Sequence, residues 1–400
     1  MTDSQSAAGY PLAHLKVLDF SRVLAGPFAG RLLCDLGADV VKVEPPDGDV
    51  TRLWGRVVAH LPGFYHQQNA GKRDICIDLR TDGGRQLAID LAAKADILIE
   101  NFRPDVMPRL GLGYEALRAV NPRLVMLSIS GFGQGGPESH RPAYAPIIHA
   151  EAGLLARQAR RGRIPYRDLP LSVADTNASL HGLVGLLAAI IARQQTGVGQ
   201  HIDLAMIDAT VATDDQLHYD LEDSEATAPL TSETWESGAG WILVSADFRY
   251  LWRILVNEFD LIDPTHKTMP LAEKIRLRRE CMQAFFAGLE SWEAVEAAMA
   301  RVNIAWGRVR EPADLPEQPT LANRGLIRSM DDRAGGQRPV VQAPWRFSNA
   351  KHGVRGPAPH RGEHNAAVLT DWLGRSATEA EALTAAGILL HDEAALGEQS

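Results

Sequence analysis

The sequence predicts an α/β protein built around a mostly parallel sheet. Short runs of apolar and β-branched residues alternate with helical patterns from residue 15 to residue 212, which is the rhythm of successive βαβ units. The runs are mostly apolar, as expected of strands that are covered on both faces. We therefore expect a ligand at the carboxyl ends of these strands, where open α/β sheets bind their ligands.

Each element of this region follows from its local pattern. Residues 131–150 are rich in glycine and proline and are expected to form an irregular segment. The next helix, around 181–194, is apolar on almost all sides, which predicts burial inside the protein or at a subunit interface. Strands are expected at 15–20, 39–44, 73–79, 96–101 and 124–130, helices at 27–38, 81–95 and 114–121, and a further strand and helix within 199–212.

The pattern changes near residue 220, where an acidic, turn-rich stretch has the composition of a linker. A strand and several amphipathic helices follow, and prolines break the pattern near 314–325. We predict residues 1–220 as the first part of a large domain and 221–325 as a linker with a smaller α+β domain. Residues 326–400 are expected to return to the large domain.

Composition excludes several classes of protein. The 400 residues are 45% hydrophobic and carry 41 basic and 50 acidic side chains, a formal charge of -9 that disfavours nucleic-acid and anionic-membrane partners. Cys34, Cys76 and Cys281 lie far apart, and the histidines form no ligand-spaced pair, so neither a disulfide framework nor a metal site is expected. A cytoplasmic protein is expected, because no secretory signal pattern opens the sequence.

Asp175, in the stretch LSVADTNASLHG, stands at the start of the apolar helix. It could cap that helix by accepting backbone amide hydrogen bonds. It could also be a nucleophile, because a carboxylate with an ordinary pKa of about 3.9 is ionised at neutral pH and needs no general base. An acyl thioester would suit it best, since a thiolate leaves readily. The residues alone leave both roles open.

Two other features could hold an anionic ligand. The turn SRVLAGPFAG at 21–30 joins a strand to a helix, but it lacks the glycine spacing of dinucleotide and P-loop motifs. Arginines suit phosphate groups if the fold gathers them at one edge of the sheet. The candidates are Lys42, Lys72, Arg73, Arg103 and Arg109.

Seven motifs in order resemble those of the family III CoA-transferases, the CaiB/BaiF family, which includes formyl-CoA transferase and carnitine CoA-transferase. They are LKVLDFSRVLAGPFAGRLLCDLGADVVKVEPP, NAGKRDICIDLRT, ADILIENFRPDVMPRLGLGYEAL, NPRLVMLSISGFG, ADTNASLHGLVGLLAA, TGVGQHIDLAMIDA and PHRGEHNAAVL. The resemblance covers most of 12–220 and about 300–374.

This resemblance implies a Rossmann-like large domain made from both ends of the chain, a smaller inserted domain, and an interlocked homodimer. It implies a CoA-transferase in which Asp175 is the catalytic nucleophile, with acyl-CoA and a carboxylic acid as its partners. CoA thioester is then a substrate, and no metal or other cofactor is required.

The resemblance also assigns binding residues. Lys72 and Arg109 are expected to meet phosphates, and Phe102 the adenine. The positions expected near CoA are Val23, Lys72, Asn101, Phe102, Arg109 and Met206.

The acyl pocket is assigned to Leu24, Tyr144 and His149. Leu24 replaces a catalytic glutamine of formyl-CoA transferase and Ala145 replaces a glutamate, which disfavours formyl and oxalyl groups. Two arginines that hold the nucleotide in that enzyme are Pro45 and Pro46 here.

Two alternatives stand beside transfer. An α-methylacyl-CoA racemase shares the fold, but its histidine and aspartate would fall at Tyr144 and Ala145, which cannot move a proton in that way. The other alternative is a catalytically silent acyl-CoA binding protein in which Asp175 only caps its helix.

Overall fold

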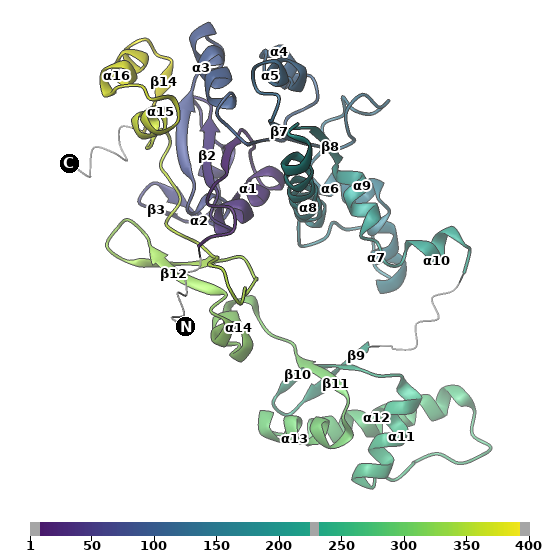
Figure 1. Ribbon diagram of the computed structural model, residues 1–400. Helices are drawn as coiled ribbons and strands as arrows, with labels where there is room; N and C mark the ends of the chain where they lie inside the picture. Colours follow the sequence, from purple (N-terminus) through teal and green to yellow (C-terminus); the bar gives the residue numbers. More distant parts are fainter. Residues whose placement is uncertain (1–8, 225–231, 393–400) are drawn as a thin grey trace, which may run out of the picture. The chain divides into compact units, whose positions relative to one another are not determined.

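The computed structural model describes residues 9–224 and 232–392, so the middle of the predicted linker, 225–231, lies outside the described residues. The chain divides into two compact units, one formed by 1–215 with 324–400 and the other by 216–323. The sequence placed these divisions at 220 and 325. Figure 1 follows the chain through both units.

The large unit contains a seven-stranded sheet in the order β14-β5-β2-β1-β6-β7-β8. All neighbours are parallel except the β14–β5 pair, which confirms the predicted parallel α/β fold. The six parallel strands have the Rossmann order 3-2-1-4-5-6 when numbered along the chain, so the order reverses between β1 and β6. The strands are β1 (Lys16–Asp19), β2 (Asp39–Glu44), β5 (Arg73–Ile77), β6 (Ile97–Glu100), β7 (Val125–Ser130), β8 (His201–Ala205) and β14 (Leu389–Leu390).

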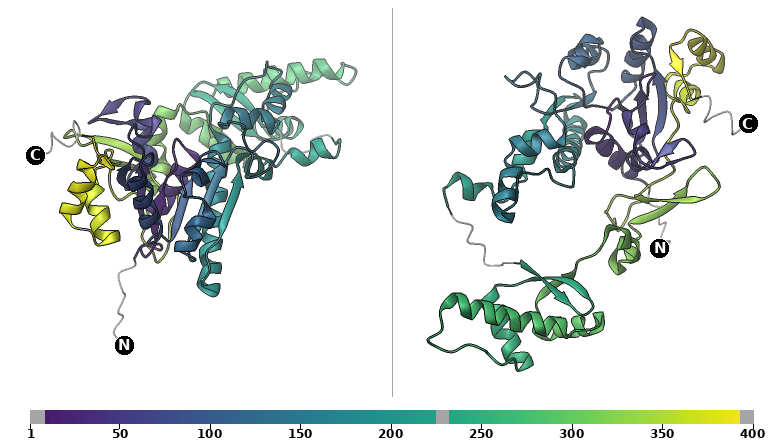
Figure 2. Two further views of the ribbon diagram at one scale, coloured as in Figure 1. Left: turned by 90° about the horizontal axis from the view of Figure 1, so that it is seen from above. Right: turned by 180° about the vertical axis from the view of Figure 1, so that it is seen from behind.

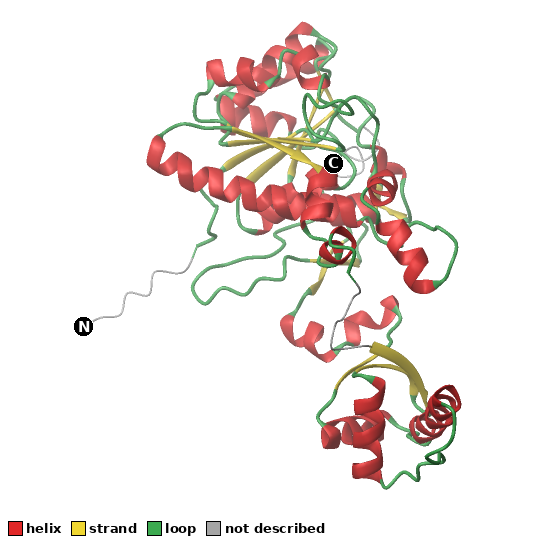
Figure 3. Ribbon diagram, turned by 90° about the vertical axis from the view of Figure 1, so that its right-hand side faces the viewer, coloured by secondary structure: helices red, strands yellow, loops and turns green. Residues whose placement is uncertain are grey.

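Helices cover both faces of this sheet (Figure 3). Successive strand residues enter opposite cores, as the two-residue period of a strand requires. Val17 and Ile97 join the core under α1 and α8, whereas Leu18 and Leu98 join the core under α3, α5 and α15. The helices of this unit are α1 (Ala25–Asp35), α2 (Gly63–Asn69), α3 (Asp82–Ala92), α4 (Val106–Arg109), α5 (Tyr114–Val120), α6 (Ala145–Glu151), α7 (Leu154–Gly162), α8 (Val173–Thr196), α9 (Met206–Ala212), α15 (Asn365–Leu373) and α16 (Ala377–Ala385).

The segment after residue 324 is tied to the first strands of the sheet (Figure 2). β14 pairs with β5, and the Gly362 amide donates to a buried Asp74 carboxyl oxygen over 2.6 Å. The Cys76 amide donates to Asn365 Oδ1, a residue 289 positions later in the sequence. Smaller elements here are the 3₁₀ helix η1 (Val50–Leu53) and the short strands β3 (Val57–Val58), β4 (Leu61–Pro62), β12 (Ile327–Asp331) and β13 (Gln337–Val341).

The second unit has its own core around Trp235, Trp252 and Phe286. Its antiparallel sheet has the order β11-β10-β9. The elements are α10 (Leu217–Leu221), β9 (Ser232–Ser237), β10 (Gly240–Ser245), α11 (Phe248–Phe259), α12 (Leu271–Ala287), α13 (Trp292–Val302), β11 (Ala305–Arg308), the 3₁₀ helix η2 (Pro312–Glu317) and α14 (Pro319–Arg324), which crosses the boundary between the units.

Two helix predictions need correction. The helix α8 begins at Val173, ahead of the expected start, and α6 occupies the end of the segment expected to be irregular. Burial of α8 is also one-sided, because Leu180, Val184 and Ile191 are 46%, 66% and 58% exposed. Among described helices, α8 alone has the length and hydropathy of a membrane span, with 44% of its most apolar window buried. Length and composition are weak evidence for a span, and its buried side packs against α1, α9, β7 and β8.

Candidate active site

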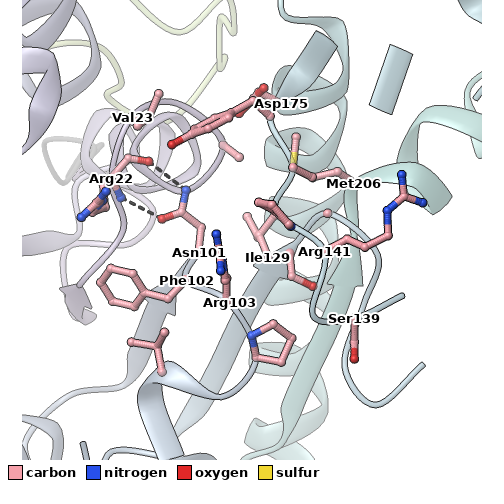
Figure 4. A pocket seen from close by; sticks show the side chains of 18 of the residues that line it. Arg22, Val23, Asn101, Phe102, Arg103, Ile129, Ser139, Arg141, Asp175 and Met206 are labelled. Atoms are coloured by element: carbon pink, nitrogen blue, oxygen red, sulfur yellow. Dashed lines mark hydrogen bonds between the residues drawn. The ribbon is translucent and has the colours of Figure 1, made fainter. Parts of the chain in front are cut away.

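A pocket of about 520 Å³ lies where the strand order reverses, next to the loops that follow β1, β6 and β7. This is where a Rossmann-type sheet places its ligand. In Figure 4, Asp175 stands at the head of the pocket between the Arg22–Val23 loop and Met206. The lining residues are Arg22, Val23, Ala25, Asn101, Phe102, Arg103, Pro104, Val106, Arg109, Ile129, Ser130, Gly131, Ser139, Arg141, Pro142, Ala143, Tyr144, Asp175 and Met206.

Asp175 is the third residue of α8, and the N-cap position belongs to Ser172. Burial raises the pKa of the Asp175 carboxyl to about 6, and the backbone amides of Ala25 and Ala145 act in the opposite direction by hydrogen bonding to its ionised form. These amides belong to the first residues of α1 and α6. The carboxyl lines the pocket at the start of α8, which packs against α1 and α6.

The loop after β1 is fixed by Asn101. The Arg22 amide donates to Asn101 Oδ1 over 2.8 Å, and Asn101 Nδ2 donates back to the Arg22 carbonyl oxygen over 2.8 Å (Figure 4). Val23 then adopts a φ of 67°, which is rare for a β-branched residue and is the kind of strain found at ligand sites. Gly26 is required because a Cβ there would lie 2.1 Å from the Ser21 Cβ.

Four arginines line the pocket, and the sequence singled out two of them. Arg109 pairs with Asp105 over 3.1 Å, and Arg141 pairs with Glu138 and Glu151. Within 9–224 and 232–392, no ion pair or side-chain hydrogen bond occupies the guanidinium groups of the exposed Arg22 and Arg103. Arg22 and Arg141 were not predicted from the sequence, although Arg22 directly precedes Val23 in the turn after β1.

Of the other expected CoA-binding residues, Val23, Asn101, Phe102 and Met206 line the pocket, whereas Lys72 does not. Its side chain is 0% exposed, and its ammonium donates to Asp19 Oδ2 at 2.8 Å, the Pro27 carbonyl oxygen at 2.9 Å and Asn69 Oδ1 at 2.9 Å. An ammonium has three hydrogens to donate, so none remains for a phosphate. Lys72 instead supports the β1–α1 connection from behind.

The expected acyl-pocket residues are also divided. Tyr144 lines the pocket and is 62% exposed. Leu24 is buried as the N-cap of α1, and His149 is buried on α6, so neither lines the pocket. His149 nevertheless lies close to the nucleophile candidate, because its Nε2 accepts a hydrogen bond from the amide of Ala174 over 3.2 Å.

Comparison with known proteins identifies the family. Residues 12–365 match the family described as CoA-transferase family III. The chain belongs to this family. It is a CoA-transferase, and CoA thioesters and carboxylic acids are the substrates of such enzymes.

Individual family III relatives agree with this assignment. The succinate–glutarate CoA-transferase of Agrobacterium fabrum is 32% identical over 386 residues, which is 90% of this chain and 95% of that protein. The acetyl-CoA:oxalate CoA-transferase of Acetobacter aceti is 42% identical over 203 residues, 50% of this chain and 52% of that protein. The crystal structure of a CAIB/BAIF family protein from Brucella suis has a TM-score of 0.77 at 29% identity and covers 91% of this chain and 100% of that one.

Proposed function

We propose that this family III enzyme transfers CoA through covalent intermediates on Asp175. A carboxylate oxygen attacks the thioester carbonyl, the C–S bond breaks and CoA leaves as a thiolate, so that a mixed anhydride forms. The thiolate then attacks the aspartyl carbonyl, which releases the donor acid and leaves an aspartyl-CoA thioester. The acceptor acid repeats these steps in reverse, and Asp175 returns as a free carboxylate. No water is consumed and no net proton transfer is needed.

The observation that carries this proposal is the placement of Asp175. It is the one acidic side chain among the described residues lining the pocket, and the backbone amides of Ala25 and Ala145 favour its ionised form. A carboxylate that is partly removed from water is a better nucleophile, and nearby amides can stabilise the negative charge that develops on the attacked carbonyl.

The alternatives find less support. A racemase needs an acid and a base on opposite sides of the α-carbon, but no histidine, lysine or second carboxylate stands among the described lining residues. A silent binding protein would need Asp175 only as a cap, yet Asp175 is the third residue of α8 and lines the pocket. Both arguments favour transfer.

CoA is proposed to lie along the loops after β1 and β6. Arg22, Arg103 and Arg109 would meet its phosphates, because guanidinium groups bind phosphate oxygens in pairs. Val23, Asn101, Phe102 and Met206 would line the path from the nucleotide to Asp175. Tyr144 would face the acyl group.

The names of two relatives suggest which acids give and accept CoA, because they include succinate, glutarate and oxalate. We propose small dicarboxylic acids as donor and acceptor. The replacement of glutamine and glutamate by Leu24 and Ala145 still predicts poor use of oxalate. A screen of acids against succinyl-CoA and acetyl-CoA, with new thioesters weighed by mass spectrometry, tests both statements.

A homodimer is proposed on the basis of α8. Leu180, Val184 and Ile191 recur at helical spacing and are at least 46% exposed, so they form an apolar stripe on its outer side. Burying such a stripe against a second copy would remove it from water. A monomer in light scattering at micromolar concentration would contradict this proposal.

Asp175→Ala tests the proposed mechanism. The variant is expected to lose transfer by at least about 10³-fold, as for other covalent nucleophiles. Wild-type protein incubated with acyl-CoA and then hydroxylamine should carry a modification at Asp175, and the variant should carry none. Asp208→Ala, at an exposed aspartate of α9 outside the pocket, is the matched control and should retain activity. Near-normal transfer by Asp175→Ala would defeat the mechanism.

A further inference from the structure

His149 is a buried histidine whose two ring nitrogens are both engaged. Nδ1 lies 2.8 Å from Asp168 Oδ1, and Nε2 lies 3.2 Å from the amide nitrogen of Ala174. The His149 residue is 0% exposed, whereas the Asp168 side chain is 42% exposed on the segment between α7 and α8. The ring therefore links that segment to the start of α8.

The partners fix the proton on the ring. An amide can only donate, so Nε2 must accept from Ala174 and must carry no hydrogen. In the neutral ring the hydrogen is then on Nδ1, from which it is donated to the Asp168 carboxylate. In the other tautomer the hydrogen on Nε2 would point at the hydrogen of the Ala174 amide, and no hydrogen bond could form. Asp168 thus favours the one form of His149 that can bind Ala174.

This hydrogen bond acts on the turn that carries Asp175. Ala174 is the second residue of α8, and its amide is one of those that have no partner within the helix. Ser172 at the N-cap makes no side-chain hydrogen bond, so the ring of His149 supplies the missing acceptor. The residue that it holds is the immediate neighbour of Asp175.

A second contact comes from the same helix. His149 lies four residues after Ala145 on α6, which places the two residues on one side of the helix. The backbone amide of Ala145 lowers the pKa of the Asp175 carboxyl, and His149 accepts a hydrogen bond from the adjacent amide of Ala174. Two residues of α6 therefore act on the first turn of α8, His149 through the Ala174 amide and Ala145 through the Asp175 carboxyl.

We infer that His149 and Asp168 are positioning residues that hold the first turn of α8 so that Asp175 faces the thioester. Neither touches the substrate, because neither lines the pocket. The inference rests on the proposed nucleophilic role of Asp175. It assigns His149 a place behind the nucleophile, in contrast to the acyl-pocket position that the sequence suggested.

Three variants separate the contacts. Asp168→Asn keeps the volume of an exposed side chain but removes the charge that selects the tautomer. His149→Asn places an amide nitrogen near the position of Nδ1 and loses the acceptor for Ala174. His149→Gln places an amide oxygen near the position of Nε2 and restores that acceptor. His181→Asn, at an exposed histidine of α8, is the matched control.

The measurement is the single-turnover rate of Asp175 acylation, followed by mass spectrometry, together with kcat and the KM for acyl-CoA. A misplaced nucleophile can cost about 10²-fold in rate. We expect losses of about 10-fold to 10²-fold in acylation for Asp168→Asn and His149→Asn, KM within about threefold, and partial recovery in His149→Gln. His181→Asn should match the wild type.

Acylation within about threefold of wild type in a folded Asp168→Asn variant would overturn the inference. So would a raised KM with unchanged kcat, because that pattern belongs to a residue that binds substrate. If His149→Asn does not fold, Asp168→Asn decides the question, since its side chain is at the surface. Failure of the proposed mechanism is distinguishable, because it would appear as transfer by Asp175→Ala.

Discussion

Replacing Asp175 by asparagine should stabilise the protein at neutral pH while it removes activity. Burial raises the pKa of this carboxyl from its ordinary 3.8 to about 6. The folded protein therefore keeps the Asp175 proton to a higher pH than the unfolded chain does. Between these two pKa values the free energy of unfolding of the wild type falls as the pH rises. Above about pH 6 it stays lower by the full amount. The asparagine variant has no ionised form and no such cost.

The size of the effect follows from the shift. A change from 3.8 to about 6 corresponds to about 3 kcal/mol of unfolding free energy above pH 6. Asparagine keeps one oxygen for the amides of Ala25 and Ala145 where the carboxylate had two, which reduces the gain. We therefore expect Asp175→Asn to be about 1 to 3 kcal/mol more stable at pH 8, with the difference shrinking toward zero near pH 4.

Urea unfolding followed by far-ultraviolet circular dichroism at pH 4.5, 5.5, 7 and 8 measures this difference. Asp208→Asn is the matched control, because Asp208 is exposed and its replacement should give no pH-dependent gain. A variant that is less stable than wild type at pH 8, or a difference that does not change with pH, would refute the reasoning. The result would then mean that the surrounding amides fully offset the burial of the carboxylate.

Four further outcomes are expected. The proposed nucleophile is the ionised form of Asp175, whose pKa is about 6, so the acylation rate should be flat above pH 7 and fall about tenfold per pH unit well below pH 6, measured by single-turnover mass spectrometry. Arg103→Ala should raise the KM for acyl-CoA about tenfold with little change in kcat. Lys72→Met should leave the buried carboxylate of Asp19 without its ion pair and lower the free energy of unfolding by about 3 to 5 kcal/mol. Val184→Glu combined with Ile191→Glu should yield a monomer in light scattering, and a dimer of unchanged affinity would remove α8 from the proposed interface.

The sheet could be predicted from the sequence because each strand is short, apolar and local. Residues 124–130 were expected to be a strand covered on both faces, and β7 at Val125–Ser130 is buried along its whole length. The position of Asp175 near the start of a helix was equally local. The ligand site at the carboxyl ends of the strands follows from parallel topology alone.

The roles of individual polar side chains could not be predicted in this way, because their partners are distant in sequence. Lys72 was predicted to bind phosphate, but its ammonium is buried and donates to Asp19, which lies 53 positions earlier in the sequence. His149 was predicted to line the acyl pocket, but its Nδ1 contacts Asp168 and its Nε2 accepts from the amide of Ala174. Which side of α8 is buried within its own chain could not be predicted for a related reason, since an apolar sequence does not say whether a helix side is covered by the same chain or by another subunit.

The late return of the chain to β5 affects how the protein is made. During translation β5 leaves the ribosome long before β14 is made. The Cys76 amide donates to Asn365, which is added to the chain 289 residues later. A nascent chain at that stage presents β5 as an open sheet edge, and such edges are prone to pair with other chains. The second unit, whose core is complete by β11, can already fold at that point, while the large sheet stays unfinished until β14 has been made.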